Sequence, residues 1–544
     1  MLLSLGLDFG TESVRAVLVD VSSGSFAAVA ASNYAHGVID HELPTGGGTL
    51  PHDFALQHPQ DWLDSAGAAC KTALREAGAK PEEIVGIGVD FTSCTMLPAL
   101  ANGTPLCLAG DFARDPMAWP KLWKHHGAKA ATDRINLVAA ERKEPWLARY
   151  GGVIGLEWFF PKILETLSES PRAYNAAEVY LEAGDWFVWQ LVDGPFPCCK
   201  PANLSRSACQ AGYKAMWSSH GGYPSADYFA AVNPQMRDVV SKKMPGTIAA
   251  PGRRVGALSM TSADLLGLLP GTPVSAVIID AHAGVPGAGV AEADTMVLVI
   301  GTSACHMMNS AIEKMAPGVA GVVEDGILPG FFGYETGQAA VGDAFAWVTQ
   351  TLGKSHAELT RAALDLPPGS NGVLALDWVN GCRTPLMDGR LSGAFVGMTL
   401  RTQPEQLYRA MMEGTGFGLR WIVDTLRDAG VPVQKFVASG GLPAKSPLLM
   451  QIYADILNAP IELAESDQSV ALGAAILGCL AAGPEATGHK NIQQAIHAMA
   501  RQRTDLVYRP TAAAAAPYAK LYQLYRQLGE SSGTTAAVMR QLRA

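Results

Sequence analysis

An apolar run that ends on a carboxylate constrains the fold more than any other stretch of this sequence. The segment Val277–Ile279, preceded by Val274, is rich in β-branched residues, which is typical of a buried strand. The run stops at Asp280, and the small residues and glycine that follow favour a turn. Because open α/β sheets bind ligands at the ends of their strands, this carboxylate is a candidate for a binding or catalytic site. Strands also end on Asp simply because Asp suits turns.

Two glycine turns favour the functional interpretation. A second apolar strand, Met296–Ile300, ends on Gly301–Ser303, and near the N-terminus the turn Asp8–Ser13 separates two apolar runs. Glycine lets backbone N–H groups point toward an anion. The hydroxyl side chains that would add donors are Thr11, Ser13, Thr302 and Ser303. Each turn alone could be an ordinary hairpin tip, but their repetition in two halves of the chain indicates a duplicated nucleotide cleft.

A third glycine turn, Ser439–Gly441, follows a predicted strand and leads through Lys445 into a helix. The glycine spacing differs from that of a Walker A loop. A backbone turn at a helix N-terminus still suits a purine nucleotide and its phosphates. The segment 467–480 is a predicted helix of small residues that could pack flat against a ring.

Composition excludes several classes of protein. At 544 residues the chain is too long for one core, and 48% hydrophobic residues, 17% charged residues and 57 glycines fit an α/β enzyme. The net charge of -9 argues against nucleic-acid or anionic-membrane partners. The nine cysteines contain no C-x-x-C pair, and no apolar run reaches about 18 residues. We therefore expect a soluble cytoplasmic protein.

Several polar residues leave alternatives open. Lys214, among apolar neighbours, is either a surface lysine or a charge directed into a pocket. Glu335, between glycines, is either a ligand contact or part of a turn. The adjacent His125 and His126 would point in different directions on a helix, so we expect a solvated face and no metal site there.

The hairpin Asp8–Ser13, the strand end at Asp280, and the turns Gly301–Ser303 and Ser439–Gly441 occur together and in this order. That set resembles the FGGY family of carbohydrate kinases, within the actin-like ATPase superfamily. Further stretches resemble the members that act on ribulose, so that the similarity covers essentially the whole chain. These stretches are 86–92, 122–126, 157–162, 213–217, 335–338 and 376–385.

The resemblance implies an α/β fold of two actin-like (ribonuclease H-like) domains with a nucleotide and sugar cleft between them. Residues 1–284 would hold the sugar and the catalytic base, and residues 285–544 would bind ATP. The implied reaction is ATP-dependent phosphorylation of the 5-hydroxyl of L-ribulose, a step of L-arabinose catabolism. The implied cofactors are ATP and Mg²⁺, the implied partner is a small-molecule sugar, and a homodimer is compatible with the sequence.

The family pattern also assigns roles to residues. It makes Asp280 the general base, which an ordinary Asp can be because it is ionised at pH 7, and Asp8 the acid that holds Mg²⁺. The implied sugar contacts are Ser93, Trp123, Lys214, Asp280 and Glu335. The implied nucleotide contacts are Gly10, Thr11, Ser13, Gly301, Thr302, Ser303, Gly440, Gly441 and Lys445. The pair Ser93–Cys94 stands where the family pattern leads us to expect Ala or Gly.

Rival hypotheses remain at this stage. One is another FGGY kinase, acting on xylulose, D-ribulose, ribitol, glycerol or gluconate. Another keeps the actin-like fold for an ATP-driven chaperone, which the sequence disfavours because no acidic linker or peptide-binding domain is visible. A catalytically silent sugar sensor is disfavoured because both phosphate turns and the acid are present.

Overall fold

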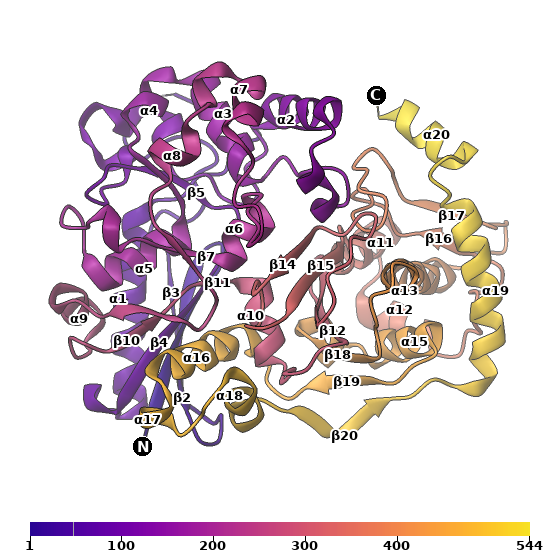
Figure 1. Cartoon of the computed structure of the whole chain (residues 1–544). Coiled ribbons are helices and arrows are strands. Elements are labelled where there is room, and N and C mark those ends of the chain that lie inside the picture. Colours follow the sequence, from indigo (N-terminus) through magenta and orange to yellow (C-terminus); the bar gives the residue numbers. More distant parts are fainter. Residues whose placement is uncertain (47, 544) are drawn as a thin grey trace.

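The computed structural model describes residues 1–46 and 48–543, and within them two seven-stranded sheets lie side by side (Figure 1). The first has the order β3-β2-β1-β4-β10-β9, with β11 paired to β4. Its strands are β1 Leu3–Phe9, β2 Ser13–Asp20, β3 Phe26–Asn33, β4 Ile84–Phe91, β9 Arg254–Ala257, β10 Pro273–Ser275 and β11 Ile278–Ile279.

The second sheet has the order β14-β15-β13-β12-β18-β19-β20. Its strands are β12 Thr295–Ile300, β13 Ala304–Ser310, β14 Gly321–Glu324, β15 Phe332–Gln338, β18 Lys435–Ser439, β19 Ile461–Ala464 and β20 Gln502–Tyr508. Three short pairs complete the strands: β5 Met96–Ala99 with β6 Val179–Glu182, β7 Ser205–Ser207 with β8 Thr247–Ala249, and β16 Leu374–Leu376 with β17 Ala394–Val396.

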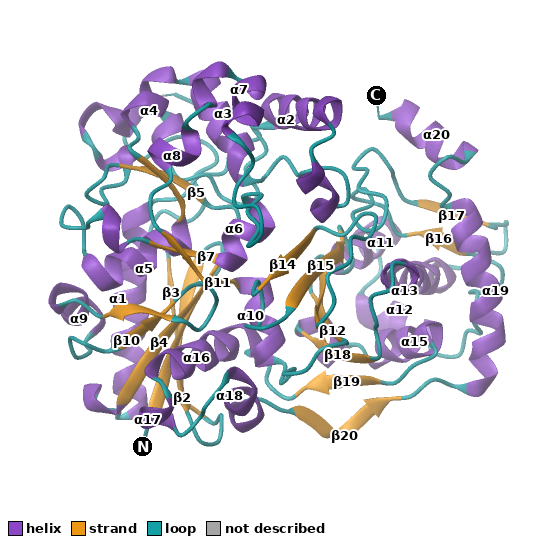
Figure 2. Ribbon diagram, viewed as in Figure 1, coloured by secondary structure: helices purple, strands orange, loops and turns teal. Residues whose placement is uncertain are grey.

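Helices cover both faces of each sheet (Figure 2). In β2, Leu18 packs into the core under α1, whereas Val17 and Val19 pack with α16 on the other face, as the alternation of a strand requires. The helices are α1 Pro59–Ala77, α2 Lys129–Arg142, α3 Phe159–Glu169, α4 Pro171–Ala176, α5 Ala183–Asp193, α6 Ala208–Lys214, α7 Ala226–Val232, α8 Val239–Lys243, α9 Met260–Leu266, α10 Asp280–Gly287, α11 Gly342–Leu352, α12 His356–Ala363, α13 Pro404–Asp428, α14 Gly441–Lys445, α15 Pro447–Leu457, α16 Ser469–Ala482, α17 Pro484–Thr487, α18 Ile492–Met499, α19 Ala512–Leu528 and α20 Thr534–Leu542.

The same strand arrangement occurs in both sheets. An antiparallel hairpin, β1–β2 or β12–β13, has its first strand parallel to a later strand, β4 or β18. Apolar runs and glycine turns thus predict both hairpins correctly. The turn of the first is shorter than expected, because Asp8 lies on β1 and Ser13 opens β2.

The structure corrects the prediction at Asp280. The strand β11 is only Ile278–Ile279, and the chain then enters α10 directly, without the expected turn. Ala and Gly in this segment are compatible with a helix when neighbouring elements pack closely around it. Asp280 is consequently the first residue of a helix at the end of a strand.

Helix α16 belongs to the later part of the chain but packs on the first sheet, against β1 and β4, and on α10 (Figure 1). Glycines make this contact close: a Cβ at Gly88 would lie 1.7 Å from the carbonyl oxygen of Ala474, and one at Gly287 would lie 1.7 Å from that of Ser469. The small residues of α16 therefore serve backbone packing, and the suggestion that they pack against a ring is wrong.

No single described helix is long and apolar enough to cross a bilayer. Ser469–Ala482 and Pro484–Met499 reach that length and composition only together, as a pair bent by 110°.

We predict that Gly88→Ala lowers the free energy of unfolding by about 3 kcal/mol, because a backbone carbonyl cannot move aside as a side-chain tip can. Urea unfolding measures the loss. Gly389→Ala is the matched control, since a Cβ there meets nothing within 4 Å and the entropy gained from the unfolded chain is the same. Equal stability of the two variants would mean that α16 and β4 are not in backbone contact.

Candidate functional site

A cavity of about 430 Å³ lies between the two sheets and is lined by residues from both halves of the chain. It brings together the ends of β4 and β11, the start of α10, the β12–β13 turn and β15. Of the predicted site residues, Ser93, Trp123, Lys214, Asp280, Thr302, Ser303 and Glu335 line it. Residues that the sequence analysis did not assign, Cys94, His126, Glu157, Asn380 and Arg383 among them, also line it.

Asp280 faces this cavity from the first position of α10. Its Oδ1 accepts a hydrogen bond of 2.7 Å from the backbone N–H of Ala281. Burial raises the pKa of Asp280 to about 7, despite that N–H, which acts in the opposite direction. The expectation of an Asp with an ordinary pKa is therefore wrong.

Three carboxyl groups meet at neighbouring strand ends. Asp8 on β1 pairs in register with Asp90 on β4, and Asp90 pairs with Ile278, two residues before Asp280. Asp8 accepts a bond of 2.7 Å from Arg15. Both oxygens of Asp90 are buried. Burial, together with Asp8 and Asp280, raises its pKa well above the usual value, so that the protonated carboxyl can donate a hydrogen bond to Asp8.

Asp90 is a candidate metal ligand that was not predicted from the sequence. The signal was present, because the strand 84–91 also ends near a carboxylate, as the strand before Asp280 does. Carboxylate oxygens are the ligands that Mg²⁺ prefers, and a divalent cation would compensate the charge of a deprotonated Asp90. The neighbouring carboxyl groups of Asp8 and Asp90 therefore fit the cation that the family resemblance implies.

Lys214 and Glu335 form a buried ion pair in the cavity wall. The Lys214 Nζ lies 2.8 Å from both Oε1 and Oε2 of Glu335, and Arg383 Nη2 lies 3.2 Å from Oε1. Burial alone would raise the pKa of Glu335, but Lys214 and His282 beside it hold that pKa well below the usual range. Burial alone would lower the pKa of Lys214, but the Glu335 carboxylate beside it raises that pKa above the usual value. Lys214 is thus directed into a pocket, not toward bulk solvent.

Trp123, in the cavity wall, is hydrogen-bonded to the N-terminal hairpin. The indole Nε1 donates a bond of 3.1 Å to the hydroxyl of Thr11. The two glycine turns close in the same way: Gly10 N–H donates to the Ser13 carbonyl at 3.0 Å, and Gly301 N–H donates to that of Ser303 at 2.9 Å.

The third glycine turn lies against the second. Gly440 has a φ of 104°, and a Cβ there would lie 2.6 Å from the carbonyl oxygen of Ile300, next to Gly301. Gly441 opens α14, which ends at the exposed Lys445. The predicted helix after this turn is present, but it is divided into two helices, α14 and α15, of which the second ends at Leu457. Lys445, Gly440 and Gly441 do not line the 430 Å³ cavity in the part of the chain that is described.

The structure corrects the prediction for His125. It is fully buried, its Nε2 lies 2.9 Å from Glu165, and its Nδ1 accepts from the N–H of Ala55. His125 is therefore part of a core network and does not lie on a solvated helix face. His126 is exposed and lines the cavity.

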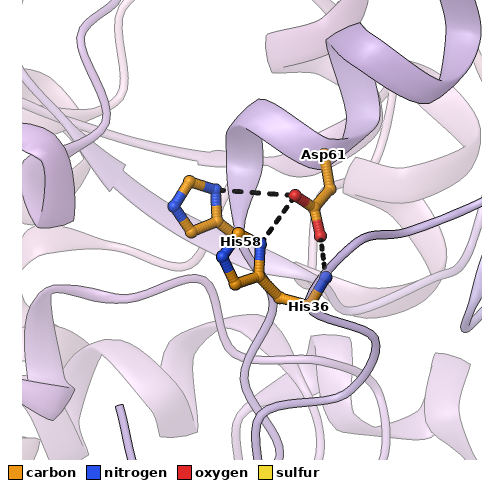
Figure 3. A group of neighbouring side chains, drawn as sticks. All are labelled: His36, His58 and Asp61. Atoms are coloured by element: carbon orange, nitrogen blue, oxygen red, sulfur yellow. Dashed lines mark hydrogen bonds and ion pairs between the residues drawn. The ribbon is translucent and has the colours of Figure 1, made fainter. Parts of the chain in front are cut away.

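Within the described ranges, one group of His, Cys, Asp or Glu residues brings three ligand atoms within 4.8 Å of one another: His36, His58 and Asp61 (Figure 3). Asp61 accepts from both the ring and the backbone N–H of His36, each at 2.8 Å. The two imidazole rings stack at 4.3 Å with an angle of 11°. The lone pairs of two stacked rings lie in separate, nearly parallel planes, so one ion cannot lie in the plane of both rings at the bond length of about 2 Å that a metal needs. Hydrogen bonding accounts for this cluster.

Comparison with known proteins identifies relatives over the whole chain. The model of the FGGY family of carbohydrate kinases, C-terminal domain, matches residues 296–482. The chain is 43% identical to a ribulokinase of Bacillus licheniformis, covering 98% of this chain and 97% of that protein. It is 44% identical to a ribulokinase of Shouchella clausii, covering 99% and 98%.

Solved structures show the same fold at lower identity. A ligand-bound xylulose kinase from Lactobacillus acidophilus superposes with a TM-score of 0.79 at 20% identity, covering 99% of this chain and 100% of that one. This likeness confirms the predicted α/β fold of two actin-like domains. The full-length identity to ribulokinases and the match to the family model lead to one conclusion: the chain belongs to the FGGY family of carbohydrate kinases.

Proposed function

We propose that this protein transfers the γ-phosphate of ATP to the 5-hydroxyl of L-ribulose, giving L-ribulose 5-phosphate and ADP in L-arabinose catabolism. The observation that carries the proposal is the placement of Asp280 in one cavity with the Lys214–Glu335 pair, between two halves that each carry a glycine turn. The full-length identity to ribulokinases supports the choice of sugar.

Asp280 acts as the general base in this proposal. As the sugar oxygen attacks, the hydroxyl proton passes to the Asp280 carboxylate, the bond from that oxygen to the γ-phosphorus forms, and the bond from the γ-phosphorus to the bridging oxygen breaks. ADP leaves with the electron pair of the broken bond. A rigid strand–helix junction suits this role because it fixes the carboxylate relative to the cavity.

The other assigned residues bind and orient. Lys214 and Glu335 offer a donor and an acceptor to sugar hydroxyls, with Ser93 and Trp123 on the same wall. Asp8, with Asp90 beside it, would hold Mg²⁺, which when bound offsets charge on the β- and γ-phosphates. The proposed phosphate contacts are Gly10, Thr11, Ser13, Gly301, Thr302 and Ser303, and those on the adenosine side are Gly440, Gly441 and Lys445.

Four further expectations belong to this proposal. Residues 1–284 would form the sugar-binding domain that supplies the base, and residues 285–544 the ATP-binding domain. A cytoplasmic location, a homodimer and the absence of nucleic-acid or membrane partners stay predictions.

A sugar panel tests the function. Turnover is followed as ADP formation with Mg-ATP and L-ribulose, D-ribulose, D-xylulose or ribitol. We expect the highest kcat/KM with L-ribulose. A preference for another sugar would change the substrate that we assign but would leave the protein a sugar kinase of the same family. Hydrolysis stimulated by unfolded peptide and by no sugar would reject the kinase proposal.

We predict that Asp280→Ala lowers kcat at least about 100-fold, the lower range of general-base effects, with little change in ATP affinity. Steady-state kinetics and nucleotide titration measure the two quantities. Asp264→Ala, an exposed aspartate on α9, is the control. Near-normal turnover in Asp280→Ala would end the role of Asp280 as base.

The raised pKa of Asp280 predicts a pH dependence. A base must be deprotonated, so kcat/KM for ribulose should rise with pH through about 7 and be lost below it. An ordinary Asp, with a pKa near 4, would leave the rate constant across that range. Values of kcat/KM measured from about pH 5 to 9 distinguish these two cases. The residual kcat/KM of Asp280→Ala should not show the rise near pH 7.

We predict that Glu335→Gln raises the KM for ribulose at least about tenfold, because it removes a charged acceptor and leaves the Lys214 ammonium buried without its partner. Kinetics at saturating ATP measure it. Glu413→Gln is the control, since Glu413 forms an equally buried pair with Arg409 on α13. An equal rise of KM in both variants would assign the effect to stability.

A further inference from the structure

Lys162 is a fully buried lysine that the proposed chemistry does not use. It lies on α3, in one of the stretches that resemble ribulose-phosphorylating relatives but that no site role explains. Its ammonium donates to three backbone carbonyls, those of Cys94, Lys121 at 3.2 Å and Leu122 at 2.8 Å. Among the described residues, no carboxylate lies within 4.0 Å of its Nζ.

These carbonyls belong to two segments of one cavity wall. Cys94 lines the cavity together with Ser93, and its φ of 59° lies in the left-handed region that non-glycine residues rarely adopt. Leu122 immediately precedes Trp123, which lines the cavity and bonds Thr11. One side chain thus joins the segment carrying Ser93 to the segment carrying Trp123.

Charge explains why a lysine occupies this position. Three carbonyl oxygens directed at one point repel one another, and an ammonium with three N–H donors satisfies them all. Hydrogen bonds from a charged donor are the stronger kind. An apolar residue of similar length would fill the space but remove this charged donor. The Lys121 and Leu122 carbonyls would each keep one backbone donor, the N–H of Met96 at 3.1 Å and that of His125 at 2.9 Å. The Cys94 carbonyl would lose the ammonium that it accepts from.

We propose that Lys162 is a positioning residue that fixes Ser93 and Trp123 relative to each other and so sets the shape of the sugar-binding wall. It acts through the backbone and touches neither sugar nor nucleotide. This inference rests on the proposed function, since the sugar in question is ribulose.

Lys162→Met tests the proposal, because Met keeps length and removes the donors. We expect the KM for ribulose to rise at least about tenfold, which corresponds to about 1.4 kcal/mol, while the KM for ATP changes less than about twofold. Ribulose binding measured by calorimetry without nucleotide should weaken by the same factor. A purely structural role would lower the melting temperature without this split between the two substrates.

Lys243→Met is the matched control. The Lys243 Nζ also donates to backbone carbonyls, those of Tyr174 and Ala177, and neither residue lines the cavity. We expect lower stability in this variant with an unchanged KM for ribulose. A KM in Lys162→Met that stays within twofold of that in Lys243→Met would overturn the proposal.

The experiment also distinguishes failure of the proposed function, and failure of the variant to fold, from failure of the positioning role. The wild-type protein is assayed first, and a lack of turnover with ribulose would reject the proposed function before Lys162 is considered. If Lys162→Met does not fold, Lys162→Gln, which keeps two N–H donors, takes its place with a smaller rise in the KM for ribulose. A folded Lys162→Gln variant with the wild-type KM would reject the positioning role.

Discussion

The close backbone approach of α16 to β4 and α10 is the constraint on which the rest of the structure depends. Glycines at 88 and 287 leave no room for a Cβ beside the carbonyls of Ala474 and Ser469. Through this contact a helix from the later half of the chain holds both the central sheet of the first half and the helix that begins with Asp280. The position of the proposed base therefore follows from packing between segments about 200 residues apart in the sequence.

Charge in the site is distributed unevenly. On the side proposed to bind sugar, Lys214, Arg383 and Glu335 compensate one another within one buried network. On the other side, Asp8 has Arg15 as its partner, whereas the buried Asp90 lies against another acid, Asp8. Burying an unpaired carboxyl group is costly unless it is protonated or a cation is supplied. The same unevenness suits a reaction in which a metal-bound triphosphate approaches from one side and a neutral sugar from the other.

Much of the fold could be predicted from the sequence, because apolar runs such as Val277–Ile279 and Met296–Ile300 and the glycine turns are local signals. The helix at Asp280 could not, because its small residues form a helix only where α16 packs against them. Asp90 and His125 were missed for a related reason: whether a polar residue is buried, and beside which neighbour, depends on strand register and on distant segments. Lys214 could be assigned to the pocket only with the help of the family resemblance.

The bond between the Trp123 indole and the Thr11 hydroxyl joins a wall of the proposed sugar cavity to the hairpin proposed to bind phosphate. A ligand in the cavity that moves the Trp123 indole would change the free energy of the hairpin conformation in which Thr11 accepts the indole N–H. Thermodynamic reciprocity then requires that sugar and nucleotide alter each other's affinity by the same factor. Cooperative binding of the two substrates would in that case arise within a single subunit, without any contact between protomers.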